Sequence, residues 1–322
     1  MNLPVFDLHC DTALALMGEH LDEEGSLLKN KLHIDLTRAK ALDGYCQCFA
    51  CFTTPSMQEE MGVSPIVVFE RELATIQREL HKHSRTMKLC YTPEEIESNL
   101  QKGIMSAVLT IEGPAGFGFD PELLPDLSAI GFRISTLGWN ESNVLTGSHM
   151  TGEGLSDLGK TYVKTCQDLG ILVDVSHISD AGFWDIMKIT EAPVIATHSN
   201  SRALCDHSRN LTDDMFKAIM ETDGVAGLNQ CAYFVGEKPT LDTVCDHVLH
   251  FLELDPEGKH IALGGDLDGI SSMSEGFTGL ESYPKLFDRL HERGVSEEIL
   301  RNITWNNAMG VMQRAVCNHK GS

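Results

Sequence analysis

The chain has 322 residues, of which 42% are hydrophobic and 22% are charged, so it is long enough to bury a large core. Aspartate and glutamate number 47 against 25 lysines and arginines, which gives a formal net charge of -22 at pH 7. Such a charge repels phosphate backbones and anionic lipid. We therefore do not expect nucleic acid or membranes as partners. The expected partner is a small molecule.

The hydropathy pattern predicts a cytoplasmic protein. No basic segment followed by an apolar run stands where a secretory signal would, and no run approaches the ~20 apolar residues of a membrane span. The ten cysteines agree with a cytoplasmic location, because in a reducing compartment cysteine serves as a small buried residue or a ligand. Cys46 and Cys48 in "CQCFAC" have no partner C-x-x-C pair, so we expect buried packing there.

Apolar, β-branched runs alternate with amphipathic segments along the chain. Candidate strands lie at 4–9, 44–52, 103–113, 131–137, 170–177, 192–199, 224–229 and 260–269. Candidate helices lie at 64–82, 92–102, 155–169, 180–189, 212–222, 240–253, 281–293, 296–302 and 305–316, and an acidic run at 21–25 is expected to be a solvated loop. Eight strand and helix repeats predict an α/β fold, a (β/α)8 TIM barrel.

The main alternative fold is a doubly wound open sheet. It is disfavoured because neither a G-x-G-x-x-G nor a P-loop pattern follows any candidate strand. No stretch rich in proline, glycine and serine divides the chain. We therefore expect residues 1–322 to form a single barrel domain with additional helices at the C-terminal end.

The first candidate strand ends in "FDLHCD", where His9 and Asp11 are two residues apart. Side chains two apart on a strand lie on the same face, so this imidazole and this carboxylate should converge on one point. A metal ion is the obvious occupant of such a point. An isolated H-x-D triplet is common by chance, so the prediction depends on what the other strands carry.

Four further strand ends carry residues of the same chemical kind. They are Glu112 in "LTIEGP", His177 in "DVSHIS", His198 in "ATHSNS" and Asp266 in "GGDLDG". In a (β/α)8 barrel the active site forms where the strands end, at the C-terminal face. Six ligand-type residues from five strands should therefore point into one mouth.

The ligand types predict a hydrolytic metal centre. Imidazole and carboxylate without thiolate suit zinc, manganese, iron or cobalt, and five ligands exceed what one catalytic zinc takes while keeping a position open for water. Two ions are therefore expected, with Glu112 as the bridging carboxylate and a hydroxide between the ions poised to attack. Asp266, across the barrel, would accept a proton from that water and pass it to the leaving group.

The set "HCD", "IEG", "DVSH", "THSNSRALCDHSRN" and "GGDLDG" resembles the membrane (renal) dipeptidase family of dizinc peptidases. The resemblance implies a metal-dependent hydrolase barrel in which His9, Asp11 and Glu112 hold one zinc. It also implies that Glu112, His177 and His198 hold the other zinc.

The same resemblance implies roles for two residues outside the ligand set. Asp266 would contact the catalytic water, and Arg209, eleven residues after His198, would bind the C-terminal carboxylate of a dipeptide. An arginine is suited to that task because its guanidinium pairs with a carboxylate through two hydrogen bonds.

One position departs from the pattern of the family. Animal members place an oxyanion-stabilising histidine in a "TLTH"-like stretch, whereas this chain reads "STLGWNESN" with Trp139 at that position. Tryptophan offers only its indole N–H, so the oxyanion would be stabilised by the metal pair or by Asn140. Trp139 is also a candidate for lining the substrate pocket, and for plain packing.

Two other functions remain open from the sequence. A related barrel hydrolase could act on a cyclic amide, lactone or phosphoester, but those enzymes commonly use an H-x-H first strand and a carboxylated lysine, and this chain shows neither. A non-catalytic metal-binding protein would be favoured only if a ligand or Asp266 were missing. The sequence does not decide which dipeptides are cleaved or whether they carry a D-residue at the C-terminal position. It also does not decide the oligomeric state, for which a homodimer is one candidate.

Overall fold

The strands form a parallel sheet that nearly closes into a barrel. The computed structural model describes residues 1–18 and 25–319, with side chains up to 315, so most of the acidic run at 21–25 lies outside the described residues. Within these residues one sheet contains β1 (Val5–Asp7), β2 (Tyr45–Phe52), β3 (Met87–Leu89), β4 (Met105–Glu112), β5 (Phe132–Thr136), β6 (Leu172–Asp174), β7 (Val194–Ile195), β8 (Ala226–Leu228) and β9 (Ile261–Leu263). Its strand order is β7-β6-β5-β4-β2-β1-β9-β8, with β3 paired to β4.

The two ends of this order meet through a single bridge. Ala196 pairs with Ala226, and the Gly227 N–H donates to the Ala196 carbonyl at 2.7 Å. A Cβ atom on Gly227 would lie 2.0 Å from the Thr197 carbonyl oxygen, so only glycine allows the strands to approach this closely. The bridge confirms the predicted TIM barrel, with all eight predicted strands in the ring.

Two details differ from the sequence prediction. β3 was not predicted, because three residues are too short to show a periodic pattern, and it pairs only with the first part of β4, at Met105, Ser106 and Ala107. Several strands also end earlier than predicted. β6, β7 and β9 each stop three residues before a candidate site residue, because the chain there turns toward the barrel mouth.

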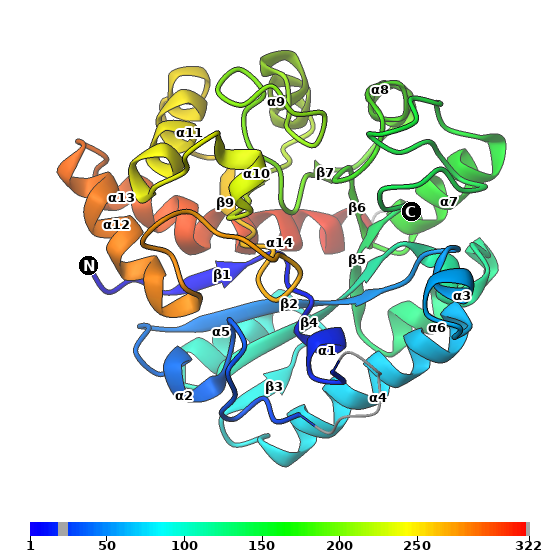
Figure 1. Cartoon of the computed structure of the whole chain (residues 1–322), viewed down its shortest axis with the longest axis horizontal. Helices are drawn as coiled ribbons and strands as arrows, with labels where there is room; N and C mark the ends of the chain where they lie inside the picture. Colours follow the sequence, from blue (N-terminus) through cyan, green and yellow to red (C-terminus); the bar gives the residue numbers. More distant parts are fainter. Residues whose placement is uncertain (19–24, 320–322) are drawn as a thin grey trace.

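The predicted helices are present and surround the strands (Figure 1). The predicted helices are α4 (Pro65–Lys82), α5 (Pro93–Gln101), α7 (Asp157–Asp168), α8 (Asp180–Ile189), α9 (Asp213–Glu221), α11 (Leu241–Leu254), α12 (Tyr283–Glu292), α13 (Glu297–Arg301) and α14 (Asn307–His319). Further short helices, which were not predicted, are α1 (Thr12–Ala15), α2 (Leu36–Ala39), α3 (Met57–Glu60), α6 (Leu124–Ala129) and α10 (Ala232–Val235). A π-helical turn, Asn302–Asn306, leads into α14, and 3-10 turns lie at Pro114–Phe117, Pro121–Leu123 and Leu280–Ser282.

Two apolar cores follow from the alternation of side chains along the strands. On β4, Leu109 and Ile111 face outward into the larger core between the barrel and the helices, whereas Val108 faces the interior. The interior core draws residues from around the ring, among them Cys46 and Cys48, which are fully buried and unpaired as predicted. Trp305, just before α14, packs against this interior core, and α14 lies beside β1 and β9 (Figure 1). The opposite end of the barrel is left to the polar residues.

Among the described residues, no helix has the length and apolar character needed to cross a bilayer.

Candidate metal centre and active site

His9 and Asp11 lie just beyond the end of β1 and are fixed by the neighbouring β9 segment. The Asp11 N–H donates to the Leu267 carbonyl at 2.9 Å, and Cys10 forms a bridge with Leu267. The buried carboxylate of Asp7 accepts the His9 N–H at 3.0 Å. The H-x-D pair is therefore held beside β9, although Asp11 leaves the extended conformation with φ -105° and ψ 24°, and its side chains converge, with His9 Nε2 at 3.5 Å from Asp11 Oδ2.

The other candidate ligands come from four further strands. Glu112 is the last residue of β4, and His177, His198 and Asp266 each lie three residues after β6, β7 and β9. His177 and Asp266 adopt positive φ angles of 68° and 57°. A left-handed backbone is uncommon outside glycine, although aspartate and histidine adopt it more often than most residues, and it is found disproportionately at functional sites.

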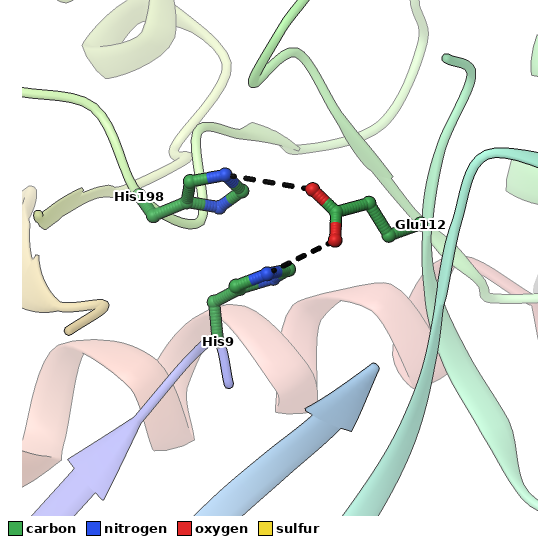
Figure 2. A group of neighbouring side chains, drawn as sticks. All are labelled: His9, Glu112 and His198. Carbon is green, nitrogen blue, oxygen red and sulfur yellow. Dashed lines mark ion pairs between the residues drawn. The ribbon is translucent and has the colours of Figure 1, made fainter. Parts of the chain in front are cut away.

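Glu112 lies between the imidazoles and offers one oxygen to each side (Figure 2). Its Oε2 atom is 3.3 Å from His9 Nε2, and its Oε1 atom is 3.0 Å from His177 Nε2 and 3.8 Å from His198 Nε2. On the other side of His9, Asp266 Oδ1 lies 3.9 Å from His9 Nε2. The structure therefore brings all six predicted residues together, and all six are buried.

The hydrogen bonds behind His198 fix which of its nitrogens carries the proton. The Thr197 hydroxyl donates to Asp174 Oδ2 at 2.6 Å, so its oxygen is left to accept from His198 Nδ1 at 2.7 Å. His198 Nδ1 is therefore the protonated nitrogen, and Nε2 presents a lone pair to the cavity.

His177 has the same tautomer for a different reason. Its Nδ1 atom lies 2.8 Å from Asn140 Oδ1, which can only accept, so Nδ1 carries the proton. The Nε2 lone pairs of His177 and His198 then face each other at 2.9 Å, close to a carboxylate oxygen of Glu112. This arrangement is repulsive unless a cation lies among the three atoms.

Two potential metal-ligand atoms on the other side of Glu112 make no hydrogen bond, and this also fits a cation. His9 Nε2 and Asp11 Oδ1 are buried and make no hydrogen bond. Isolated buried polar atoms of this kind are unfavourable, and a metal ion is one ligand that would satisfy both. Two groups of side chains bring their donor atoms within 4.8 Å of one another: His9, Glu112 and His198, and His9, Asp11 and Asp266.

The charges at the mouth are strongly unbalanced. Asp7, Asp11, Glu112, Asp174 and Asp266 are buried there, whereas Arg209 is the only buried lysine or arginine among the side chains that the structure describes. Without an ion, burial raises the pKa of Glu112 to about 8. Burial alone would lower the pKa of His9, but the charges of Glu112 and Asp11 outweigh it and raise that pKa. The metal-free centre therefore retains protons where cations would bind.

A cavity of about 290 Å³ opens onto this cluster. Its wall combines Asp11, Glu112, His177, Asp266 and Asp268 with Leu14, Phe52, Trp139, Asn140, Cys231, Phe234, Gly269, Ile270 and Ser271. Polar groups gathered at one place in a largely apolar wall are typical of small-molecule sites. A cavity of this size admits a compact substrate.

Trp139 and Asn140, predicted near the substrate, both line the cavity, and they contact different neighbours. The indole of Trp139 packs edge-on against Phe52, with ring centroids 5.1 Å apart, and lies 6.2 Å from the His177 ring. Asn140 directs its side-chain oxygen toward His177 Nδ1. The structure thus adds a contact that the sequence did not suggest, orientation of His177 by Asn140.

Arg209 is 4% exposed and is not among the residues that line the cavity, but it packs against Phe234, which is. The centre of its guanidinium is 5.4 Å from the Phe234 ring centroid, and Nη1 makes a long 3.5 Å contact with Ser199 Oγ. Its Nε and Nη2 atoms are buried without a hydrogen-bond partner. Buried guanidinium donors that lack acceptors are suited to an anionic ligand.

Several residues that hold the site were not predicted from the sequence. Asn229 donates to Asp266 Oδ2 at 3.0 Å, and Thr197 and Asp174 orient His198. Thr197 and Asp174 stand next to or shortly before predicted ligands, in "ATHSNS" and "VDVSH", and this proximity was the available signal. Phe234 carried no signal, because nothing in its local sequence distinguishes it from a packing residue.

Comparison with known proteins identifies the family of this chain. A sequence profile of the membrane dipeptidase family (peptidase family M19) matches residues 1–321. The chain belongs to the membrane dipeptidase family. This confirms the resemblance found in the sequence and places the chain among metallopeptidases that act on peptide bonds.

Individual members of the membrane dipeptidase family agree with this assignment. A protein of Schizosaccharomyces pombe described as an uncharacterized dipeptidase is 30% identical over 248 residues, which cover 75% of this chain and 61% of the yeast protein. The solved structure of a metallopeptidase from Rhodobacter sphaeroides, liganded with a phosphinate mimic of the dipeptide L-Ala-D-Ala, has a TM-score of 0.87 and 26% identity over 98% of this chain and 100% of that one. The solved structure of a dipeptidase of family M19 has a TM-score of 0.86 and 27% identity, covering 98% and 99%.

Proposed function

We propose that this protein is a dipeptidase that uses two divalent ions, zinc in the first instance. His9, Asp11 and Glu112 would hold one ion, and Glu112, His177 and His198 the other. Support comes from Glu112, whose two oxygens face different imidazoles, and from the facing lone pairs of His177 and His198. Two ions would also offset most of the negative charge buried at the barrel mouth. When bound, such ions supply a water of lowered pKa and polarise the peptide carbonyl.

Asp266 is the residue that we assign to proton transfer. Asn229 occupies its Oδ2 atom, while Oδ1 faces His9 and the cavity. Burial raises the pKa of Asp266, which makes the carboxylate a better proton acceptor. It would take a proton from the attacking water and deliver it to the leaving amine. The side-chain amide group of Asn140 remains our candidate for contact with the developing oxyanion.

The single observation that carries the choice of a dipeptide is Arg209. Its guanidinium is buried, has free donors and contacts Ser199, the residue after the candidate ligand His198, so it can bind the free carboxylate of a short substrate. If Arg209 fixes that carboxylate while the carbonyl to be attacked lies at the ions, only one residue fits between them. Trp139 and Phe52 would then contact the remainder of the dipeptide.

Substitution of Arg209 tests this choice of substrate. A charge-assisted pair contributes about 1.5–3 kcal/mol, so Arg209→Met should lower kcat/KM for dipeptides by about 10–150-fold without loss of metal. Dipeptides should be cut, and tripeptides and dipeptide amides should not. Arg289→Met, which removes an exposed ion pair with Asp242, is the matched control and should change neither activity nor metal content. Hydrolysis of amides as fast as of free acids would instead favour the cyclic-amide alternative.

We also propose that a D-residue is accepted at the C-terminal position. The solved metallopeptidase from Rhodobacter sphaeroides is liganded with a mimic of L-Ala-D-Ala, and it shares the fold over almost the whole of this chain. A paired panel of L-L and L-D dipeptides, assayed with zinc added, tests this proposal. Equal or higher kcat/KM on the L-D members is expected, and activity confined to L-L members would contradict it.

The extent of the domain, the cellular location and the assembly remain predictions. We expect residues 1–322 to unfold as one domain, and we expect a cytoplasmic protein with a dipeptide as its partner. A homodimer is the assembly to test. A single calorimetric transition, cell fractionation and light scattering on the purified protein would check these three predictions in turn.

A further inference from the structure

We propose that His149 is a positioning residue that links the candidate metal centre to the loop carrying Arg209; the inference rests on the function proposed above. His149 lies in the segment 137–156 between β5 and α7, and it was not among the residues predicted from the sequence. It neither lines the cavity nor belongs to the candidate ligand groups. Its contacts nevertheless run from one of those ligands to the substrate side of the site.

The contacts form a continuous hydrogen-bonded chain. Asn140 Oδ1 lies 2.8 Å from His177 Nδ1 and 2.9 Å from His149 Nε2, and His149 Nδ1 lies 2.8 Å from the hydroxyl oxygen of Ser208. Ser208 immediately precedes Arg209. The chain thus joins residues that are far apart in the sequence, since 59 positions separate His149 from Ser208.

With the oxygen of the Asn140 amide facing both rings, one arrangement of protons satisfies this chain. An amide oxygen accepts, so both His177 Nδ1 and His149 Nε2 must donate to Asn140 Oδ1. His149 Nδ1 then has a lone pair and accepts the Ser208 hydroxyl proton. In this arrangement each nitrogen of the His149 ring has one defined role, Nε2 as donor and Nδ1 as acceptor.

The backbone holds the imidazole in place. The His149 N–H donates to the His177 carbonyl at 2.8 Å, and Ser148 pairs with Ile178 in a short antiparallel bridge. On the other side the His149 ring lies 5.9 Å from the ring of His207, whose Nδ1 accepts the Arg209 N–H at 3.1 Å. His149 is therefore fixed to the metal-ligand loop and packed against the Arg209 loop.

The consequence concerns the orientation of the Asn140 amide. With His149 present, rotation of that amide would require His177, His149 and Ser208 all to move their protons together. Without His149, the amide can rotate and place its own NH₂ group against the His177 Nδ1 proton, which favours the other tautomer of His177. That tautomer carries its proton on Nε2, where an ion would bind, so loss of His149 should weaken the ion held by His177 and loosen the loop before Arg209.

The test compares His149→Phe, which removes both polar contacts, with His149→Gln, which keeps a donor and an acceptor. The control is His250→Gln, because His250 pairs with Asp213 and lies in α11. Zinc affinity of the metal-free proteins is measured by competition with a chelator, and KM and kcat are measured on one dipeptide. His149→Phe should lose about 10–100-fold in affinity for one ion and raise KM, with His149→Gln in between and the control unchanged. Wild-type affinity for both ions in His149→Phe would overturn the proposal.

A second measurement is independent of metal and of activity. Two-bond ¹⁵N–¹H correlation spectra of the metal-free proteins should show His177 as the Nδ1–H tautomer in the wild type and as a mixture in both the Phe and Gln variants, more so in Phe. A His177 tautomer unchanged from the wild type in these variants would overturn the inference. If His149→Phe is destabilised, the spectrum of His149→Gln gives the answer instead. Failure of the wild type to cut dipeptides would count against the proposed function alone, since the tautomer and the zinc affinity do not depend on substrate.

Discussion

The Nε2 atoms of His177 and His198 lie 2.9 Å apart, and each ring commits its other nitrogen to a fixed neighbour, Asn140 for His177 and Thr197 for His198. The two lone pairs are therefore held against each other by hydrogen bonds on the far sides of the rings. A protein gains nothing from such repulsion in the absence of a cation. Preorganised lone pairs of this kind are what a metal site requires of its ligands and of the residues behind them.

Thr197→Val should weaken metal binding without removing a ligand. Valine has the shape of threonine but cannot accept from His198 Nδ1, so the imidazole loses its fixed tautomer, and Asp174 loses a donor. Loss of such an outer contact typically costs about 10–100-fold in metal affinity or activity. Zinc competition titrations measure the change. Thr165→Val is the control, because the hydroxyl of this half-buried residue bonds only the Thr161 carbonyl within α7, and it should leave zinc affinity unaltered.

Glu112→Gln should be more damaging than the loss of any one of His9, His177 or His198. The carboxylate faces imidazoles on both sides, and its charge would offset both ions, whereas an amide offers one weaker oxygen. Activity should fall by more than the about 10–100-fold expected for an outer contact. Steady-state assays and metal analysis of the purified variant provide the check, with Glu122→Gln on the surface as the control. Retention of both ions and near-normal turnover would show that Glu112 is not the bridge.

Asp266→Asn should keep both ions and lose turnover. The proposed role is proton transfer, and removal of a general acid or base typically lowers the rate by about 10²–10⁴-fold. The amide can still hydrogen bond to Asn229, so the local structure should persist. Metal content and kcat are measured on the same preparation. Because Asp266 also falls in a group with His9 and Asp11, parallel loss of metal and activity would make it a ligand and leave the proton carrier unassigned.

The stability of the metal-free protein should fall as pH rises. Burial raises the pKa of Glu112 to about 8, so the folded chain binds a proton that the unfolded chain has released above about pH 4.5. The raised pKa of His9 acts in the same direction. Each such proton costs up to about 1.4 kcal/mol of unfolding free energy per pH unit, and the net slope should be seen from about pH 6.5 to 8, above the range in which buried histidines of lowered pKa, such as His177 and His198, oppose it. Urea unfolding across this range tests the slope.

Ions that replace those protons should remove the dependence on pH. The zinc-loaded protein is therefore expected to show a flat profile over the same range, and the gap between loaded and metal-free stability should widen as pH rises. A metal-free protein that grew more stable toward pH 8 would contradict the charges assigned to the site.

The ligand types could be predicted from the sequence because each follows an apolar run directly. His177, His198 and Asp266 stand where a buried strand gives way to a loop, and parallel strands bring such positions to one end of a barrel. The number of strands in the ring could be predicted from the same alternation of strand and helix patterns. β3 could not be predicted, because three residues are too few to show a periodic hydropathy pattern.

The hydrogen bonds that orient the ligands could not be predicted in this way. Asn140 lies 37 positions from His177, and Asn229 the same number from Asp266, and no local pattern announces such a pairing. These contacts depend on how loops from different strands meet above the barrel. Trp139 shows the same limit, since its packing against Phe52 is visible only once β2 and β5 are placed.

Glu112 is proposed to be shared by two ions. Diffraction from crystals of the zinc-loaded protein, recorded on both sides of the zinc absorption edge, locates each ion. Two anomalous peaks about 3.5–4 Å apart are expected, one touching His9 and Asp11, the other touching His177 and His198, with Glu112 in contact with both. A single peak at saturating zinc, or a second peak that does not touch Glu112, would contradict this proposal.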